Sequence, residues 1–174
     1  MTRNSKGVWV WGSFLPNENI FLTLLKKEVN SLLLSPEFDI HMTLCGPYEK
    51  ISKEFLKDVE LYCRNNYSFK VPLNGFKYQN NKFQSFYISV LRTSEIIKLR
   101  KNLFNIKRFP INNYYSPHIS LAYGEHNIKR KEKLISELSQ LPLALTLNKL
   151  SIVSVDENIN KWEINNEFLF KQAF

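Results

Sequence analysis

The stretch Ser116-Pro-His-Ile-Ser-Leu-Ala-Tyr-Gly124 contains a short phrase that occurs once before in the chain, in Glu37-Phe-Asp-Ile-His-Met-Thr-Leu-Cys-Gly46. In both places a histidine is followed by an apolar residue, a hydroxyl residue and leucine, so His41 corresponds to His118. A lone histidine between apolar residues usually belongs to the core. The chain has only 3 histidines, however, and two of them occupy the same phrase. We therefore interpret the repeated phrase as functional.

Each phrase lies in a segment with the pattern of a β-strand, where residues two apart point to the same face. His41 therefore shares a face with Thr43, and His118 shares a face with Ser120. By the same alternation Asp39, the one acid near the first phrase, is predicted on the His41 face. The apolar residues of the phrases point the other way and are predicted to pack in the core: Met42, Leu44, Ile119 and Leu121.

The rest of the chain alternates between predicted strands and helices. Runs of β-forming residues predict strands over residues 7–14, 38–45, 69–78, 83–91, 118–123, 143–155 and 162–170. Helical spacing predicts helices that begin at Pro16, Ser52, Ser94 and Ile128, with ends at Pro36, Pro110 and Leu141 for the first, third and fourth. Each histidine strand precedes a helix and then a strand that contains Leu-Asn. This weak repeat, with no linker, predicts one domain over residues 1–174, in which two similar lobes bring both histidines to a common cleft.

Two imidazoles and two hydroxyls at a common cleft suit displacement at phosphorus. Imidazole titrates near neutral pH, so one histidine can take a proton from water while the other gives a proton to the leaving oxygen. Thr43 and Ser120 can donate hydrogen bonds to phosphate oxygens as charge develops on them. Neither phrase carries the cluster of carboxylates and histidines that metal-dependent phosphoesterases use, so we expect neither a metal nor another cofactor.

Composition indicates the compartment and the possible ligands of the protein, but it does not identify the function. The net charge of +8 and the isoelectric point near 9.4 are compatible with phosphate or RNA ligands, and equally with a solubilising surface. Cys45 and Cys63 form neither a disulfide framework nor a zinc-ligand pattern. The chain has no apolar run of membrane-spanning length and no signal-peptide pattern, so we expect a cytoplasmic protein that does not associate with membranes.

The two phrases resemble the signature of the 2H phosphoesterase superfamily, in which two histidine motifs of this form lie about half a domain apart. Within that superfamily the chain is most similar to the plant-type cyclic phosphodiesterases. The similarity includes the spacing of the histidines, Pro117 and Tyr123 around the second motif, Trp11 in the first strand, and the tail from Leu147 to Glu163. It covers nearly the whole chain.

This resemblance implies a bilobal, LigT-like α+β fold, with two pseudo-symmetric lobes of antiparallel sheets and flanking helices around a central cleft. It implies hydrolysis of cyclic phosphates, such as ADP-ribose 1″,2″-cyclic phosphate and nucleoside 2′,3′-cyclic phosphates. We expect a monomer that acts on such a nucleotide, or on an RNA end, without an obligate protein partner. The implied roles are acid–base catalysis for His41 and His118, phosphate binding for Thr43 and Ser120, and substrate binding for Trp11 and Tyr123.

Two alternatives stay open at this point. One is a 2H enzyme that cleaves 2′–5′ oligonucleotides or cyclic oligonucleotide signals with the same four side chains. The other is a non-catalytic RNA-binding module, although binding alone does not need two imidazoles. We expect residues 69–92 to encode substrate choice, and we interpret His126 as a loop residue and Lys149 and Lys161 as solvated surface charges.

Overall fold

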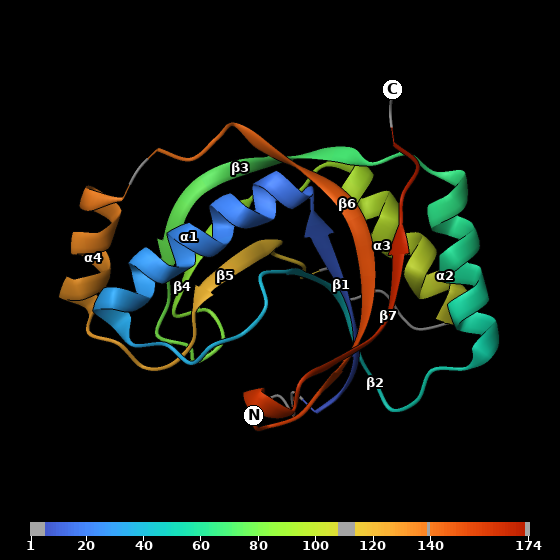
Figure 1. Ribbon diagram of the computed structural model, residues 1–174, viewed down its shortest axis with the longest axis horizontal. Helices are drawn as coiled ribbons and strands as arrows, with labels where there is room; N and C mark the ends of the chain where they lie inside the picture. Colours follow the sequence, from blue (N-terminus) through green and yellow to red (C-terminus); the bar gives the residue numbers. More distant parts are fainter. Residues whose placement is uncertain (1–5, 108–113, 139, 173–174) are drawn as a thin grey trace.

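The structure, a computed structural model, describes residues 6–107, 114–138 and 140–172. The elements within them, drawn in Figure 1, are β1 (Gly7–Phe14), α1 (Pro16–Leu33), β2 (Met42–Tyr48), α2 (Lys53–Asn65), β3 (Phe69–Tyr78), β4 (Phe86–Val90), α3 (Ser94–Lys107), β5 (His118–Ala122), α4 (Ile128–Glu137), β6 (Ala144–Val155), the short 3₁₀ helix η1 (Ile159–Lys161) and β7 (Glu163–Leu169).

The strands pair in the order β1-β2-β5-β4-β3-β6-β7, always antiparallel, and β6 also pairs with β1. Strands β1 to β6 therefore close into a ring, to which β7 is attached through β6. Figure 1 shows α1 and α4 at one end of the molecule and α2 and α3 at the other, and the helices of each pair contact one another. None of the described helices is long and apolar enough to cross a bilayer.

The ring consists of two similar halves, β1-α1-β2-α2-β3 and β4-α3-β5-α4-β6. The last strand of each half pairs with the first strand of the other, so that β3 joins β4 and β6 joins β1. The two histidine strands, β2 and β5, are neighbours, as are the two last strands, β3 and β6. An approximate twofold axis thus runs between β2 and β5, and the predicted α+β fold of two pseudo-symmetric lobes is confirmed.

The helices form where the sequence provides a suitable first residue or cap and an apolar face to bury. Proline opens α1, in a position where its missing N–H leaves no hydrogen bond unmade. At the start of α2 the Ser52 hydroxyl accepts a hydrogen bond from the Phe55 N–H at 3.2 Å, as its position in the sequence predicts. The apolar face that α1 buries consists of Leu22, Leu25, Val29 and Leu33.

The first histidine strand begins later than predicted. It covers residues 42–48 rather than 38–45, because side-chain contacts and not a strand partner hold the segment before Met42. Asp39 therefore lies outside the strand. His41 lies outside the strand as well, so strand alternation does not decide how the two side chains are oriented, and the placement of the Asp39 side chain on the His41 face stays a prediction.

Among the other elements, β4 and α4 are shortened most relative to their predicted ranges. The β4 strand begins at Phe86 because the preceding residues form a turn, in which the Gln84 N–H donates to the Asn81 carbonyl at 3.1 Å. The α4 helix ends at Glu137, since Leu138 has already left the helical conformation. Pro110, the predicted end of α3, lies outside the described residues.

The apolar residues of both phrases pack in the core, as predicted, and none of them is more than 1% exposed: Met42, Leu44, Ile119 and Leu121. Burying one such side chain stabilises the fold by about 1.5–3 kcal/mol. A slip of one residue in either strand turns these side chains outwards and the polar ones inwards, so their burial fixes which face each histidine occupies. Cys45 and Cys63 are buried free thiols.

Candidate active site

The two phrases meet where β2 pairs with β5. Met42 lies opposite Ile119 in this antiparallel pair. Facing residues of antiparallel strands share a face, as do residues two apart in one strand. His41 and Thr43 flank Met42, and His118 and Ser120 flank Ile119, so this pair sets the two phrases side by side. The fold therefore brings the two histidine phrases together, as the sequence predicts.

Both imidazoles are held by the same backbone contact. The Nδ1 atom of His41 lies 2.7 Å from the carbonyl oxygen of Asp39, and that of His118 lies 2.9 Å from the carbonyl oxygen of Ser116. A carbonyl oxygen only accepts hydrogen bonds, so Nδ1 carries the proton in each ring. In the neutral form the lone pair is therefore on Nε2, which is the nitrogen available for proton transfer.

His41 occupies the more enclosed position. The Trp11 indole stacks on its ring with 3.5 Å between the ring centres and 6° between the planes, and only 5% of the residue is exposed. Burial is the main cause that lowers the pKa of His41 to about 3, and the nearby His118 and Lys26 lower it further. The neutral form of His41 is thus strongly favoured in the free protein.

His118 is only partly buried. The Tyr87 ring meets it edge-on, with 5.3 Å between the ring centres. Burial lowers the pKa of His118 as well, while the bond to the Ser116 carbonyl opposes the shift. The Gln84 side-chain nitrogen lies 3.3 Å from Nδ1 and 3.4 Å from Nε2 of this ring. Gln84 is a neighbour of the site that the sequence patterns did not reveal, because it lies in a turn before β4.

The two hydroxyls differ in their surroundings. Ser120 is buried, and its Oγ donates to the Phe83 carbonyl at 3.2 Å. Thr43 is partly exposed, and its backbone carbonyl accepts a hydrogen bond from the Tyr115 hydroxyl at 2.7 Å. Tyr115 thus fixes the backbone beside the site.

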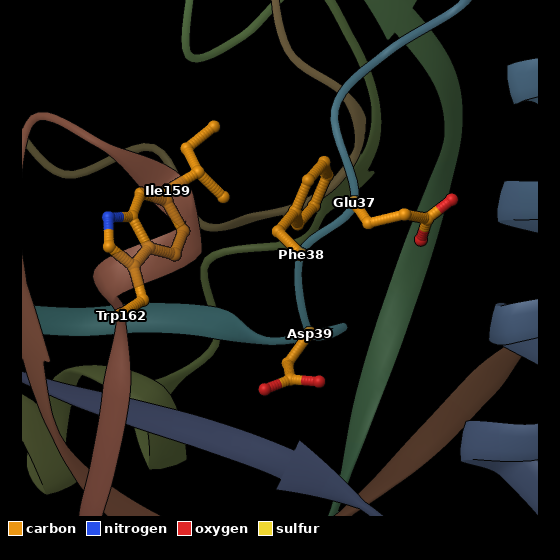
Figure 2. A pocket seen from close by; sticks show the side chains of 5 residues that line it. All are labelled: Glu37, Phe38, Asp39, Ile159 and Trp162. Atoms are coloured by element: carbon orange, nitrogen blue, oxygen red, sulfur yellow. The ribbon is translucent and has the colours of Figure 1, made fainter.

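A cavity of about 270 Å³ is lined by five side chains (Figure 2). Its walls come from the segment before β2 and from the region of η1, two parts of the chain that are far apart in the sequence. The ring centres of Phe38 and Trp162 lie 6.5 Å and 6.4 Å from that of His41. The lining residues are Glu37, Phe38, Asp39, Ile159 and Trp162. None of them lies in residues 69–92, where we expected substrate choice to be encoded.

Trp11 and Tyr123, the predicted substrate-binding aromatics, both lie beside the site but are almost fully buried. One face of Trp11 is covered by His41, and Tyr123 stacks on Phe38 with 4.0 Å between the ring centres. Burial raises the pKa of Tyr123 to about 12. Their contact with substrate stays a prediction. Trp162, which is less buried, lines the cavity instead, and its only sequence signal was its place in the tail of the family resemblance.

The other charged and polar candidates lie outside this arrangement. His126 is a loop residue whose Nδ1 lies 2.7 Å from the Ser85 hydroxyl. Lys149 forms an ion pair with Glu167 at 2.6 Å. Within residues 6–107, 114–138 and 140–172, no three side chains of His, Cys, Asp or Glu come together in a way that could hold a metal ion.

Comparison with known proteins shows which family the chain resembles. The family model of the 2'-5' RNA ligase superfamily matches residues 35–159, which include both histidine phrases. No curated protein matches the chain. The closer likeness to plant-type cyclic phosphodiesterases stays a prediction.

Solved structures share the fold at low sequence identity. The chain is similar to TT0787 of Thermus thermophilus, with 16% identity and a TM-score of 0.61 over 96% of this chain and 99% of that one. It is also similar to LigT of E. coli in the apo form, with 12% identity and a TM-score of 0.63 over 96% and 98% of the two chains. A structure of the same LigT complexed with 3'-AMP has 11% identity and a TM-score of 0.61, over 96% and 99%. These likenesses confirm the predicted LigT-like fold.

The stacking of Trp11 on His41 generates a prediction about protonation. Replacing Trp11 with alanine admits water to one face of the imidazole, so the pKa of His41 should rise from about 3 towards 6.5. NMR titration of the ring protons measures this. Trp11→Phe keeps a stacked ring and should retain most of the shift.

The lowered pKa of His41 also makes the stability of the folded protein depend on pH. Since the pKa of His41 is lower in the folded state than in the unfolded one, stability is lost as the pH falls from about 6.5 towards 3. Urea unfolding should show a smaller loss over this range for Trp11→Ala than for the wild type. An unchanged His41 pKa in a folded Trp11→Ala protein contradicts the role given to the indole.

Proposed function

The chain belongs to the 2'-5' RNA ligase superfamily, the group of 2H phosphoesterases, and we propose that it hydrolyses cyclic phosphates of nucleotides. The substrates that fit this proposal are nucleoside 2′,3′-cyclic phosphates and ADP-ribose 1″,2″-cyclic phosphate. The observation that supports it most is the Met42–Ile119 pairing, which sets the two histidine phrases side by side. That geometry supplies two proton carriers and two hydrogen-bond donors around one phosphate.

The proposed reaction uses the two imidazoles in different roles. His41, which is neutral in the free protein, takes a proton from the attacking water at Nε2. As the new oxygen–phosphorus bond forms, the bond to one ester oxygen breaks, and His118 gives that oxygen a proton from its own Nε2. The negative charge of the bound substrate raises the pKa of both rings. We assign the acid role to His118 because it is the less buried ring and so is protonated more readily.

The two hydroxyls stabilise the charge that develops on the phosphate. Thr43 is partly exposed and presents its hydroxyl on the histidine face. Ser120 exchanges its bond to the Phe83 carbonyl for a bond to a phosphate oxygen. The Gln84 amide, beside the His118 ring, adds a third donor on the same side. Such donors act most strongly where water is excluded.

The proposed reaction needs no metal. Imidazoles supply both proton transfers, and hydroxyl and amide donors compensate the developing charge. The 3′-AMP in one LigT structure is a product that opening of a 2′,3′-cyclic nucleotide yields, which supports a nucleotide in the corresponding cleft here. We propose further that residues 1–174 act as one monomeric domain, on a small nucleotide or an RNA end, without a protein partner.

Product analysis tests this function directly. The protein is incubated with 2′,3′-cyclic nucleotides, ADP-ribose 1″,2″-cyclic phosphate, 2′–5′ oligoadenylate and cyclic dinucleotides, each with and without EDTA. We expect ring opening of the cyclic phosphates at rates that EDTA does not change. Turnover restricted to the oligonucleotides supports the alternative 2H activity. RNA binding with no turnover of any substrate indicates a binding module, and activity that EDTA abolishes and a divalent cation restores contradicts the metal-free mechanism.

Substitution of the four side chains tests their roles. Because general acid–base assistance contributes about 10²–10⁴-fold, His41→Ala and His118→Ala should each lower kcat by at least about 100-fold. The double variant should be scarcely slower than either single one, since the two histidines act as a unit. Thr43→Ala and Ser120→Ala each remove one donor and should cost about 10- to 1000-fold. Steady-state kinetics on the best cyclic substrate measures these effects.

His126→Ala is the matched control, because its imidazole lies in a loop and contacts the Ser85 hydroxyl. It should retain most of the activity. All variants must first melt as the wild type does and have the same circular dichroism. Normal turnover by a folded His118→Ala protein, together with an inactive His126→Ala protein, would place the site elsewhere.

A further inference from the structure

The cavity beside His41 has walls that are held in place without a ligand. On one side the buried Lys26 ammonium donates to Glu37 Oε2 at 3.1 Å and to the Phe38 carbonyl oxygen, and it lies 4.0 Å from the centre of the Phe38 ring. On the other side the Trp162 indole N–H donates to the Asp156 carbonyl at 2.8 Å. The cavity is therefore preformed, as ligand sites usually are.

The two aromatic walls offer different surfaces. Tyr123 stacks on the Phe38 ring, and the Lys26 ammonium also lies over the Phe38 ring. Phe38 therefore turns mainly its edge to the cavity. All three ring contacts of Trp162, with Trp11, Tyr123 and His41, are edge-to-face, and no described ring is stacked on it. Figure 2 shows Phe38 across the gap from Ile159 and Trp162. A flat ligand that enters the gap can therefore stack on the indole.

The polar groups of the cavity select the kind of flat ligand. Glu37 is paired with Lys26, and its side chain points away from Trp162 in Figure 2. Asp39 lies at one end of the gap, is exposed, and forms no ion pair with any described residue. An ionised carboxylate accepts hydrogen bonds and repels phosphate. The cavity thus suits an uncharged ring that carries N–H donors, and it disfavours a second phosphate group.

Position and size restrict the ligand further. The Asp39 backbone oxygen binds the His41 ring, and the ring centres of Phe38 and Trp162 lie 6.5 Å and 6.4 Å from that of His41, so a ligand in the cavity lies near the group proposed to act on the phosphate. A volume of about 270 Å³ is slightly below the range of about 300–1000 Å³ that is typical of small-molecule pockets. One base of a nucleotide fits this description better than an oligonucleotide.

We propose that this cavity binds the nucleobase of the substrate, with Trp162 as the stacking surface and Asp39 as the acceptor for an exocyclic amino group. This inference rests on the proposed function and names its substrate class, nucleotides whose base carries an amino group, with adenine as the test case. Hypoxanthine has the same ring system but an oxygen in place of the adenine amino group, so it turns an acceptor towards the carboxylate.

The test compares 2′,3′-cyclic AMP with 2′,3′-cyclic IMP. A hydrogen bond to a charged group contributes about 1.5–3 kcal/mol, so wild-type kcat/KM should be about 10- to 100-fold higher for the adenine substrate. Asp39→Asn supplies an amide that can donate to the hypoxanthine oxygen and should remove or reverse the preference. His41 bonds to the Asp39 backbone and not to its side chain, so this variant keeps the catalytic ring in place.

Trp162→Ala should lower kcat/KM for both purine substrates by about 5- to 100-fold, the range expected for loss of one base-stacking contact, while Trp162→Phe keeps most of the activity. The loss of activity of Trp162→Ala on a base-free ribose 2,3-cyclic phosphate should be much smaller than its loss on either purine substrate. Glu37→Gln is the matched control: it also lines the cavity, but it should keep the wild-type preference for adenine over hypoxanthine.

A binding measurement separates failure of this inference from failure of the proposed function. Calorimetry with 3′-AMP and 3′-IMP requires no turnover, and it should show tighter binding of 3′-AMP that Asp39→Asn abolishes. If no cyclic phosphate is hydrolysed but this preference is observed, the proposed function is wrong and the base site stands. If wild-type protein hydrolyses the adenine, hypoxanthine and base-free substrates equally well, and folded Trp162→Ala does the same, the base site is wrong and the proposed function stands.

Discussion

The pairing of Met42 with Ile119 is the contact on which the rest of the structure depends. It joins β2 to β5, next to the approximate twofold axis of the ring. Both side chains are completely buried, so the core fixes which face each strand turns inwards. Thr43, His118 and Ser120 alternate with these core residues within the strands and are then confined to the opposite face, while His41 directly precedes β2. The polar site is thus a consequence of apolar packing.

Pseudo-symmetry fixes the backbone of the site, whereas the side chains around it break the symmetry. Trp11 pairs with Thr43 in the same way that Tyr87 pairs with Ser120, so the two aromatics occupy equivalent positions in the two halves. The indole lies flat on His41, while the phenol meets His118 edge-on. The imidazoles of His41 and His118, which make equivalent backbone contacts, therefore differ in burial. Our assignment of one as base and the other as acid follows from that difference.

Short-range patterns were sufficient to predict most of the fold and the meeting of the two histidine phrases. The phrase itself contains the strand period that sets His41 beside Thr43, and its repetition indicated two lobes. The segment before β2 could not be predicted this way, because a buried lysine eleven residues upstream of Glu37 determines its path. Trp162 reaches the His41 ring from the η1 region through tertiary packing, which no local period encodes. Gln84 lies in a turn, where strand alternation cannot predict which way a side chain points.

The central claim is that both histidines act on one phosphorus atom. The most direct measurement is a crystal structure of the protein with adenosine 2′,3′-cyclic vanadate, which mimics the five-coordinate state at phosphorus. Our account predicts that Nε2 of His41 and Nε2 of His118 lie within hydrogen-bond distance of oxygens on opposite sides of the vanadium, with the Thr43 and Ser120 hydroxyls on the remaining oxygens. Vanadate bound away from the β2–β5 pair, or touched by only one of the two imidazoles, would contradict the account.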